Sequence, residues 1–365
     1  MRALRYEGPG KILPVEVPDP DPGPDEVLLE PLTVGICFTD KLAHASPDFQ
    51  SYPPGTVLGH EFCGRVVELG DAVEGVMVGD LVAPDPRVFC GECLGCRSGY
   101  LGQCSTVRGW VGVHGGWQGA LAERVKVPAR SIHHFTAGLT PAGGACVEPF
   151  AFSLRQVRHL RPAWGDNIVL LGAEDYGLAE AALLAPIAGR LVVADPYAHR
   201  REAALRFGAH EAIDATPGLV DEVRARFPFG ADLVVVNAEA YLPRSETYLA
   251  EAYEMARPGA TVLVSRSSGG RLYPAAPSRT AWAKELDIRY FGGCFGEEPW
   301  RGGRDRGDWE VAIRAIDDRR LDPEALGATV VRFDDLRTGA DVDELMELLP
   351  AHATKVFVEV GTTGP

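Results

Sequence analysis

A cluster of four cysteines is the most specific motif in the chain. Cys90, Cys93, Cys96 and Cys104 follow the spacing C-x2-C-x2-C-x7-C among turn-forming residues. Gaps of two residues let a tight loop direct successive thiolates at one centre, and four thiolates around Zn²⁺ make a closed, structural site. An iron-sulfur cluster is the rival interpretation, because ferredoxin-type motifs also begin with C-x2-C-x2-C. Unligated or disulfide-bonded cysteines are the third, and we predict structural zinc.

A second set of residues has the chemistry of a catalytic metal site. His60 and Glu61 lie in a Gly-His-Glu run, Cys37 lies upstream and Glu148 lies downstream. A thiolate, an imidazole and a carboxylate are the ligands of an open zinc site, which keeps one position for water or substrate. A lone histidine beside an acid is more often structural. Its combination with Cys37 and Glu148 favours a metal.

A third motif follows an apolar strand-like run and precedes a helix-like run. Residues 172–177 read G-A-E-D-Y-G, where a dinucleotide-binding loop has G-x-G-x-x-G. Gly172 and Gly177 match, but Glu174 replaces the middle glycine, which normally lets the backbone approach the pyrophosphate. Carboxylates within ~6 Å of a pyrophosphate repel it by about a kcal/mol or more. A working cofactor site therefore requires Glu174 and Asp175 to turn toward solvent.

Asp195 and Arg200, which follow this loop in the sequence, bear on the choice of cofactor. Asp195 ends the next predicted strand, where an acid accepts the ribose hydroxyls of NAD and disfavours the 2′-phosphate of NADP. A plain strand-end residue is the alternative interpretation of Asp195. Arg200 lies close enough to be the counter-argument, since an arginine can accommodate a 2′-phosphate. We predict a preference for NAD.

These motifs fall in two regions with different patterns of predicted secondary structure. Short Val- and Leu-rich runs broken by Gly and Pro fill the region before about residue 150, which is typical of a β-barrel or sandwich. From about residue 163 strand-like and helix-like runs alternate, which predicts a doubly wound parallel sheet. We expect a catalytic domain of residues 1–150 and 291–365 and a nucleotide-binding domain of residues 151–290, with the C-terminal tail at the periphery of the first.

Composition excludes several classes of function. Hydrophobic residues make up 46% of the 365 residues and charged residues 24%, as in ordinary globular proteins, and no segment has the ~20 consecutive apolar residues of a membrane helix. A net charge of -15 disfavours nucleic acid and anionic membranes as partners. The N-terminus lacks the apolar region of a secretory signal. We therefore expect a cytoplasmic protein in which cysteines bind metal rather than form disulfides.

The motifs together resemble the zinc-dependent medium-chain dehydrogenases over essentially the whole chain. The matching segments are the G-H-E-x2-G-x5-G run from Gly59, Cys37-Phe38-Thr39-Asp40, the four-cysteine lobe, Gly115-Gly116 followed by Ala122-Glu123, and Lys284-Glu285-Leu286. The resemblance implies an α/β protein with a GroES-like β-barrel catalytic domain and a Rossmann domain.

The resemblance also implies roles for individual residues. Cys37 and His60 would be zinc ligands, with Glu61 and Glu148 as the carboxylates that ligate directly or exchange with water. Asp40 would be the partner that fixes the imidazole of His60. Thr39 matches the position whose hydroxyl passes the substrate proton toward the cofactor ribose. Glu148 stands where simple alcohol dehydrogenases have cysteine, which resembles the sorbitol, threonine and glucose dehydrogenase branch.

The leading hypothesis is an NAD-dependent zinc dehydrogenase that takes a hydride from a secondary alcohol of a polyol, sugar, aminocyclitol or hydroxy amino acid. A redox-neutral zinc isomerase or lyase with a degenerate NAD site is the alternative, because Glu174 interrupts the cofactor loop. A non-catalytic regulatory relative is the third, and the near-complete set of zinc ligands argues against it. The small-molecule substrate stays open, and the family implies a homodimer or homotetramer.

Overall fold

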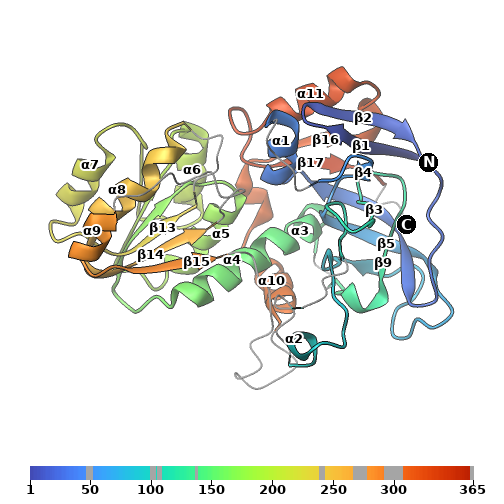
Figure 1. Ribbon diagram of the computed structural model, residues 1–365, viewed down its shortest axis with the longest axis horizontal. Coiled ribbons are helices and arrows are strands. Elements are labelled where there is room, and N and C mark those ends of the chain that lie inside the picture. Colours follow the sequence, from blue (N-terminus) through green and yellow to red (C-terminus); the bar gives the residue numbers. More distant parts are fainter. Residues whose placement is uncertain are drawn as a thin grey trace. The chain divides into compact units, whose positions relative to one another are not determined.

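The chain divides into two compact units, which are described here one at a time (Figure 1). One comprises Met1–Ala151 with Phe295–Pro365, and the other comprises Phe152–Cys294. Each contains its own buried hydrophobic cluster. The computed structural model describes residues 1–46, 52–98, 104, 109–135, 139–237, 243–265, 278–291 and 307–361. No helix within those ranges is long and apolar enough to cross a membrane.

The first unit is built on a sheet of short strands in the order β16-β17-β3-β5-β6, with β9 paired to β3. The strands are β3 (Glu26–Gly35), β5 (Glu61–Leu69), β6 (Leu81–Val82), β9 (Val125–Pro128), β16 (Thr329–Arg332) and β17 (Val356–Glu359). All pairs are antiparallel except β16 with β17. The expectation that the C-terminal tail lies at the periphery is wrong, because β17 is inserted beside β3 and its first three residues are buried.

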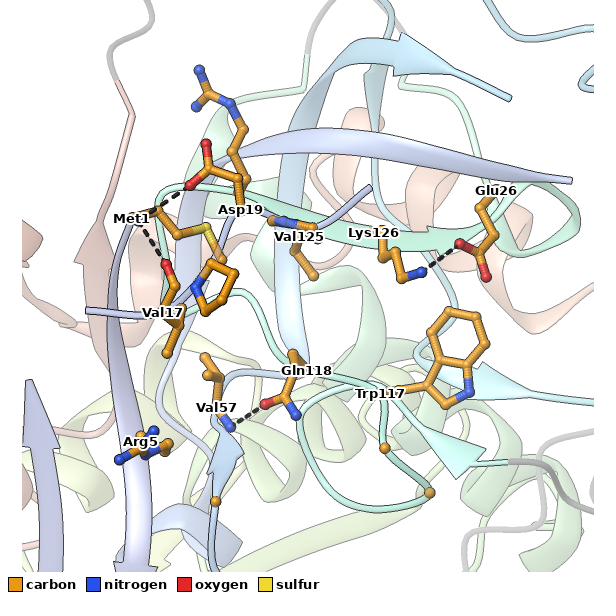
Figure 2. A pocket seen from close by; sticks show the side chains of 16 residues that line it. Met1, Arg5, Val17, Asp19, Glu26, Val57, Trp117, Gln118, Val125 and Lys126 are labelled. Atoms are coloured by element: carbon orange, nitrogen blue, oxygen red, sulfur yellow. Dashed lines mark hydrogen bonds and ion pairs between the residues drawn. The ribbon is translucent and has the colours of Figure 1, made fainter. Parts of the chain in front are cut away.

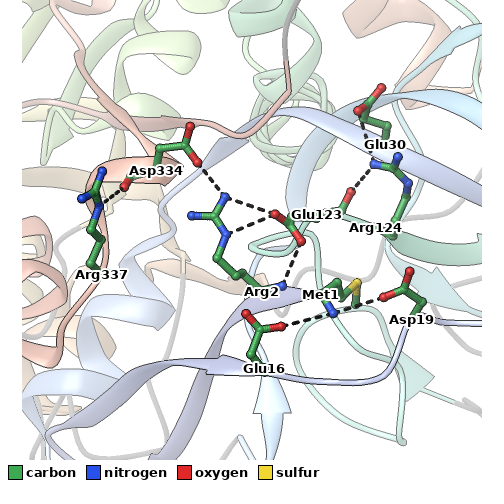
Figure 3. A network of polar contacts seen from close by, with 9 residues as sticks. All are labelled: Met1, Arg2, Glu16, Asp19, Glu30, Glu123, Arg124, Asp334 and Arg337. Atoms are coloured by element: carbon green, nitrogen blue, oxygen red, sulfur yellow. Dashed lines mark hydrogen bonds and ion pairs between the residues drawn. The ribbon is translucent and has the colours of Figure 1, made fainter.

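A smaller sheet in the order β2-β1-β4 adjoins this core. It consists of β1 (Arg2–Gly8), β2 (Lys11–Glu16) and β4 (Thr56–Val57), and a short pair, β7 (Arg87–Val88) and β8 (Gly109–Trp110), lies apart from both. A polar network anchors the first strand (Figure 3). In this network Arg2 donates to Glu123 at 3.1 Å and to Asp334 at 2.6 Å. The N-terminal strand is thereby tied to a segment more than 300 positions later in the chain.

The first unit also contains helices, several of which begin at capping side chains. They are α1 (Phe38–Ala45), α2 (Leu94–Arg97), α3 (Pro141–Ala145), α10 (Asp308–Asp317) and α11 (Gly339–Glu347). The side chain of Thr140 accepts the amide of Gly143 at 3.1 Å, and proline follows Thr140, so that α3 starts with a capped first turn. A Cβ on Gly144 would lie 2.7 Å from that of Cys63. Only glycine allows α3 to pack this closely on β5.

The second unit is a six-stranded parallel sheet in the order β12-β11-β10-β13-β14-β15. The strands are β10 (Asn167–Leu171), β11 (Arg190–Ala194), β12 (Glu211–Ile213), β13 (Ala231–Val236), β14 (Ala256–Ser265) and β15 (Asp287–Phe291). The helices are α5 (Asp175–Leu184), α6 (Ala198–Arg206), α7 (Leu219–Arg226), α8 (Tyr248–Met255) and α9 (Ser278–Ala283), while α4 (Val147–Leu160) spans the division between the units. The predicted α/β class with a doubly wound sheet is confirmed.

Strand order explains why the glycine loop lies where it does. Counted along the chain, the sheet has the order 3-2-1-4-5-6, which reverses direction at β10. In such sheets ligands bind at the carboxyl ends of the strands beside this reversal. The strand is a buried apolar run, as expected for a central parallel strand. The loop that follows it, beginning at Gly172, is therefore at the position where a dinucleotide would bind.

Candidate metal and cofactor sites

The pairing of β3 with β5 brings the candidate metal ligands together. Cys37 lies two residues beyond the end of β3, His60 directly precedes β5, and Gly35 pairs with Glu61 across the two strands. One ligand atom each of Cys37, His60 and Glu61 lies within 4.8 Å of the others, and all three residues are buried. The structure thus brings the thiol of Cys37, which is distant in sequence, beside the imidazole of His60 and the carboxylate of Glu61.

One atom of this cluster shows that a cation fits. Nδ1 of His60 is buried and has no hydrogen-bond partner among the described residues. A buried polar atom without a partner costs about 1–3 kcal/mol, so such atoms are rare in native proteins. Sulfur, nitrogen and oxygen are the donors that zinc prefers. The cluster therefore has both the chemistry and the unmet ligand atom of a zinc site.

Asp40 is held differently from what the sequence predicted. Its carboxylate accepts the amide of Cys37 at 3.0 Å and the hydroxyl of Tyr52 at 2.9 Å. The hydrogen bond to the imidazole of His60 that the family resemblance implies is not formed, and the nearest donors to the two carboxylate oxygens are this amide and this hydroxyl. Burial raises the pKa of Asp40, while the nearby charge of His60 opposes that rise. Asp40 thus orients the ligand loop through the backbone of Cys37.

Tyr52 is a residue of the site that sequence reasoning missed. Its hydroxyl lies 2.8 Å from Oγ1 of Thr39 as well as beside Asp40. Burial raises the pKa of Tyr52 well above its ordinary value, so the hydroxyl stays protonated. The residue therefore connects the hydroxyl of Thr39 to the carboxylate next to the metal ligands.

Lys355 is the second residue that sequence reasoning missed. Its ammonium forms an ion pair with Glu61, and the two side chains are 2% and 0% exposed. Burial alone would raise the pKa of Glu61, but Lys355 and His60 outweigh it and hold the pKa below its usual value. A Cβ on Gly35 would lie 2.7 Å from Oε2 of Glu61 and 2.9 Å from Cε of Lys355. Glycine at the end of β3 therefore leaves the space that this pair occupies.

Glu148 does not belong to the group of three converging ligand atoms. It is buried in the first turn of α4, with 4% of its surface exposed. Among the described residues, the group with ligand atoms within 4.8 Å contains Cys37, His60 and Glu61 and not Glu148. The ring of Trp110 packs edge-on against His60 with centroids 6.4 Å apart. Among the described residues, Glu61 is the carboxylate whose oxygen groups with the ligand atoms of Cys37 and His60.

The four-cysteine lobe has the dimensions of a zinc site. Sγ of Cys90 lies 3.8 Å from that of Cys96 and 3.6 Å from that of Cys104, and all four ligand atoms, with that of Cys93, are within 4.8 Å of one another. A tetrahedron with Zn–S bonds of about 2.3 Å requires sulfurs about 3.8 Å apart. An iron-sulfur cluster, whose cysteines bind different irons, needs a wider spacing. The distances therefore favour zinc over the rival interpretation.

The pKa values of these thiols also favour a bound cation. Burial and the neighbouring thiols raise the pKa of Cys96 to about 12. The amide of Cys93, which donates to Sγ of Cys90 at 3.3 Å, lowers the pKa of Cys90. A bound cation reverses such a rise, because a coordinating thiol is deprotonated outright. The lobe is therefore poised to hold zinc with Cys90 as one thiolate.

The glycine loop after β10 has the close contacts that its first and third glycines allow. Gly172 has φ +101°, and a Cβ there would lie 3.1 Å from the carbonyl oxygen of Asn237. A Cβ on Gly177 would lie 2.2 Å from the carbonyl oxygen of Gly172. Any other residue at Gly177 would push α5 away from the strand. The backbone of a dinucleotide-binding loop is therefore present on both sides of Glu174.

Glu174 does not turn toward solvent, and neither does Asp175, which corrects the expectation from sequence. The two residues are 2% and 5% exposed. An oxygen of Glu174 lies 3.6 Å from Nη1 of Arg200, which is itself 3.7 Å from the carboxylate of Asp195. The attraction of a buried guanidinium, which sequence spacing could not reveal, explains why the carboxylate faces inward.

The carboxylate of Asp195 is hydrogen-bonded to backbone amides of the unit itself. Its two oxygens accept the amides of Ala173 at 2.9 Å and Tyr197 at 2.8 Å. The carboxylate therefore ties the glycine loop to the end of β11. Each oxygen of a carboxylate has a second lone pair, so this role leaves capacity for a ribose hydroxyl.

The prominent cavity of the first unit is separate from all of these residues. It measures about 630 Å³ and is lined by residues that include Arg5, Trp117, Gln118 and Lys126 (Figure 2). Neither the candidate zinc ligands nor Thr39 or Asp40 lines it. Lys126 is paired with Glu26 at 2.9 Å. The cavity is therefore not part of the site that the motifs predict.

Comparison with known proteins bears on the resemblance. Residues 23–137 match the model of the alcohol dehydrogenase GroES-like domain. L-threonine 3-dehydrogenase of Saccharopolyspora erythraea is 29% identical over 309 residues, which are 82% of this chain and 84% of the relative. The chain is thus similar to medium-chain dehydrogenases over most of its length. These matches confirm the resemblance inferred from the motifs and the assignment to the oxidoreductases.

Other relatives extend the match. L-galactonate-5-dehydrogenase of Escherichia coli K12 is 36% identical over 203 residues, 55% of this chain and 58% of the relative. A structure described as a zinc-binding dehydrogenase of Sinorhizobium meliloti 1021 bound to NADP has a TM-score of 0.80 and 25% identity, with 98% of both chains covered. The alcohol dehydrogenase rspB of E. coli CFT073, complexed with NADH, has a TM-score of 0.81 and 26% identity, with 98% and 99% covered. These similarities do not favour the redox-neutral alternative.

Proposed function

We propose that this protein is a medium-chain dehydrogenase that uses zinc and NAD to oxidise a secondary alcohol of a polyol, sugar, aminocyclitol or hydroxy amino acid. The observation that carries the proposal is the buried convergence of Cys37, His60 and Glu61, in which Nδ1 of His60 has no hydrogen-bond partner within the described part of the chain. The relatives named for L-threonine and L-galactonate support small hydroxylated substrates. A zinc ion bound by Cys90, Cys93, Cys96 and Cys104 would stabilise the first unit.

The residues around the metal position divide the remaining work. When bound, zinc supplies Lewis acidity that favours loss of the substrate's hydroxyl proton. Thr39 offers a hydroxyl to accept that proton, and Tyr52 holds Oγ1 of Thr39 at 2.8 Å. Asp40 fixes the amide of Cys37 at 3.0 Å, which keeps the thiolate ligand in place. Lys355 holds Glu61 beside the other two ligands.

For the carboxylate ligand we propose Glu61, because it is already within reach of Cys37 and His60. Glu148 stays a candidate for exchange with it, as the family resemblance implies. Asp195 at the end of β11 supports a preference for NAD over NADP, with Arg200 nearby as the counter-argument. A homodimer or homotetramer is tested by light scattering of the purified protein.

The test is NADH formation on a panel of substrates. Purified protein loaded with zinc is assayed with NAD or NADP and with L-threonine, L-galactonate and common polyols, by absorbance at 340 nm. Cys37→Ser should reduce the rate at least about 10³-fold, as expected when a metal ligand is lost. Cys63→Ser is the matched control, because Cys63 is a buried thiol on β5 outside both metal clusters.

The outcomes separate the alternatives. Reduction of NAD by one or more of the substrates, dependent on zinc and on Cys37, supports the proposal. Equal rates with Cys37→Ser and the wild type would contradict the metal role. Conversion of a substrate without any change in added or bound nicotinamide would instead identify a redox-neutral enzyme.

A further inference from the structure

We propose that the carboxylate of Glu174 is an intramolecular competitor of the dinucleotide pyrophosphate and sets a low affinity for the cofactor. The inference rests on the proposed NAD-dependent function and concerns the regulation of that same site. Its basis is the buried ion cluster that Glu174 of the glycine loop forms with Arg200. The sequence pattern of a dinucleotide-binding loop has glycine at this position and forms no such cluster.

The position of Glu174 is the first observation. It is the N-cap residue of α5, a helix of ten residues, and precedes its first turn directly. In a dinucleotide-binding sheet the pyrophosphate binds at the N-terminus of this helix, where unpaired amides and the helix dipole attract an anion. A carboxylate that resides here is an anion supplied by the protein itself.

The orientation of the side chain is the second observation. If Gly172 carried a Cβ, that atom would lie only 3.2 Å from Oε2 of Glu174. The carboxylate therefore folds back over the first glycine of the loop instead of extending away from it. The carboxylate of Glu174 therefore lies against the loop backbone that a middle glycine would leave bare for a phosphate.

The third observation is the cation that retains it. Arg200 is fully buried, and its Nη1 lies 3.6 Å from Oε2 of Glu174 and 3.7 Å from Oδ2 of Asp195. Asp195 is also bound to the amides of Ala173 and Tyr197. The carboxylate of Asp195 is thus held by two amides in addition to Arg200, and the same guanidinium attracts the carboxylate of Glu174.

Binding of the cofactor then has a defined cost. Either the side chain of Glu174 leaves Arg200, which breaks a buried ion pair, or it stays and repels the pyrophosphate at short range in a medium of low dielectric constant. Both routes weaken binding. Removing the charge at Glu174 should therefore tighten NAD about tenfold, which is about 1.4 kcal/mol, and removing its bulk as well should tighten it further.

Titration calorimetry of the zinc-loaded full-length protein tests this inference. NAD and NADH are titrated into the wild type, Glu174→Gln and Glu174→Gly at low and high salt, with circular dichroism confirming that each is folded. Glu180→Gln is the matched control. Glu180 is an equally buried carboxylate of α5, 1% exposed and bonded to Nδ2 of Asn237 at 3.0 Å, roughly 9 Å further along the helix axis.

The expected order of affinity is Glu174→Gly, then Glu174→Gln, then the wild type, with Glu180→Gln within about twofold of the wild type. The gap between Glu174→Gln and the wild type should shrink as salt rises, since salt screens charge. Wild-type affinity equal to that of both Glu174 variants would overturn the inference and leave the proposed function standing. An equal gain in Glu180→Gln would overturn it too. Absence of binding by all four proteins at millimolar nicotinamide cofactor would overturn the proposed function and the inference with it.

Discussion

Replacing Lys355 with methionine should destabilise the first unit strongly. The ammonium of Lys355 is paired with Glu61, and with 2% and 0% of these side chains exposed, no discount for solvent screening applies. Removal of one partner from a buried pair costs about 3–5 kcal/mol, because the remaining charge stays buried. We expect that loss for Lys355→Met in metal-free protein. Zinc should reduce it, because a cation beside Glu61 replaces part of the missing charge.

A matched pair in the same unit supplies the control. Lys126 and Glu26 are 2.9 Å apart, but Lys126 is 38% exposed, so Lys126→Met should cost less than about 1 kcal/mol. Urea titrations give the change in the free energy of unfolding. Hydrogen exchange of peptides from β5 and β17 assigns it to the first unit.

The double variant Glu61→Gln with Lys355→Met should recover part of the loss, because neither charge is then left alone. A cost below about 1 kcal/mol for Lys355→Met in metal-free protein would refute this reasoning. So would equal costs for Lys355→Met and Lys126→Met, since the argument depends on their different burial.

Three further results are expected. Tyr52→Phe should lower kcat about tenfold with zinc retained, because Thr39 loses the hydroxyl 2.8 Å from its Oγ1; unchanged steady-state kinetics would count against that role. Cys63, whose pKa burial raises to about 12, should resist iodoacetamide at pH 8 until the protein is denatured, and mass spectrometry showing rapid labelling of native protein would disagree. The amide and guanidinium of Arg2 lower the pKa of Glu123 in the folded protein. Glu123 therefore stabilises the fold above its unfolded pKa of about 4.3. This contribution is lost as pH falls through the lower folded pKa. Glu123→Gln and wild type should therefore differ slightly in urea titrations at pH 7 and converge at lower pH, whereas a gap that widens in acid would contradict the sign.

Much of the secondary structure of the second unit could be predicted, because the composition of each short segment indicates a strand or a helix. The strand Ala231–Val236 is one of the alternating strand-like runs, and its mostly apolar sequence suits a buried parallel strand. The short strand Glu211–Ile213 and the helix Leu219–Arg226 carry weaker patterns and were not predicted. Their positions depend on packing against neighbours rather than on their own composition.

The candidate site could be predicted only in part, for a related reason. Motif spacing pointed to Cys37 and His60, but Lys355 lies 294 positions from the Glu61 that it pairs with. Lys355 directly precedes β17, and nothing in its sequence context marks it as a site residue until β17 is known to insert beside β3. Tyr52 likewise carries no motif.

Side-chain direction was the other quantity that the sequence could not supply. Glu174 was expected to face solvent because its charge conflicts with a pyrophosphate. The structure turns it toward Arg200 instead, since a buried guanidinium attracts the nearest carboxylates. The direction of this side chain depends on how the loops after β10 and β11 lie relative to each other. Spacing along the chain does not encode that arrangement.

Zinc stoichiometry by elemental mass spectrometry tests the central claim most directly. Protein purified without chelator should contain two zinc ions per chain, one in the four-cysteine lobe and one at Cys37, His60 and Glu61. Cys37→Ser should retain one ion and its fold, whereas Cys93→Ser should retain one and unfold more easily, because structural zinc contributes folding energy. One ion or none per chain in the wild type, or equal stability of Cys37→Ser and Cys93→Ser, would contradict the account.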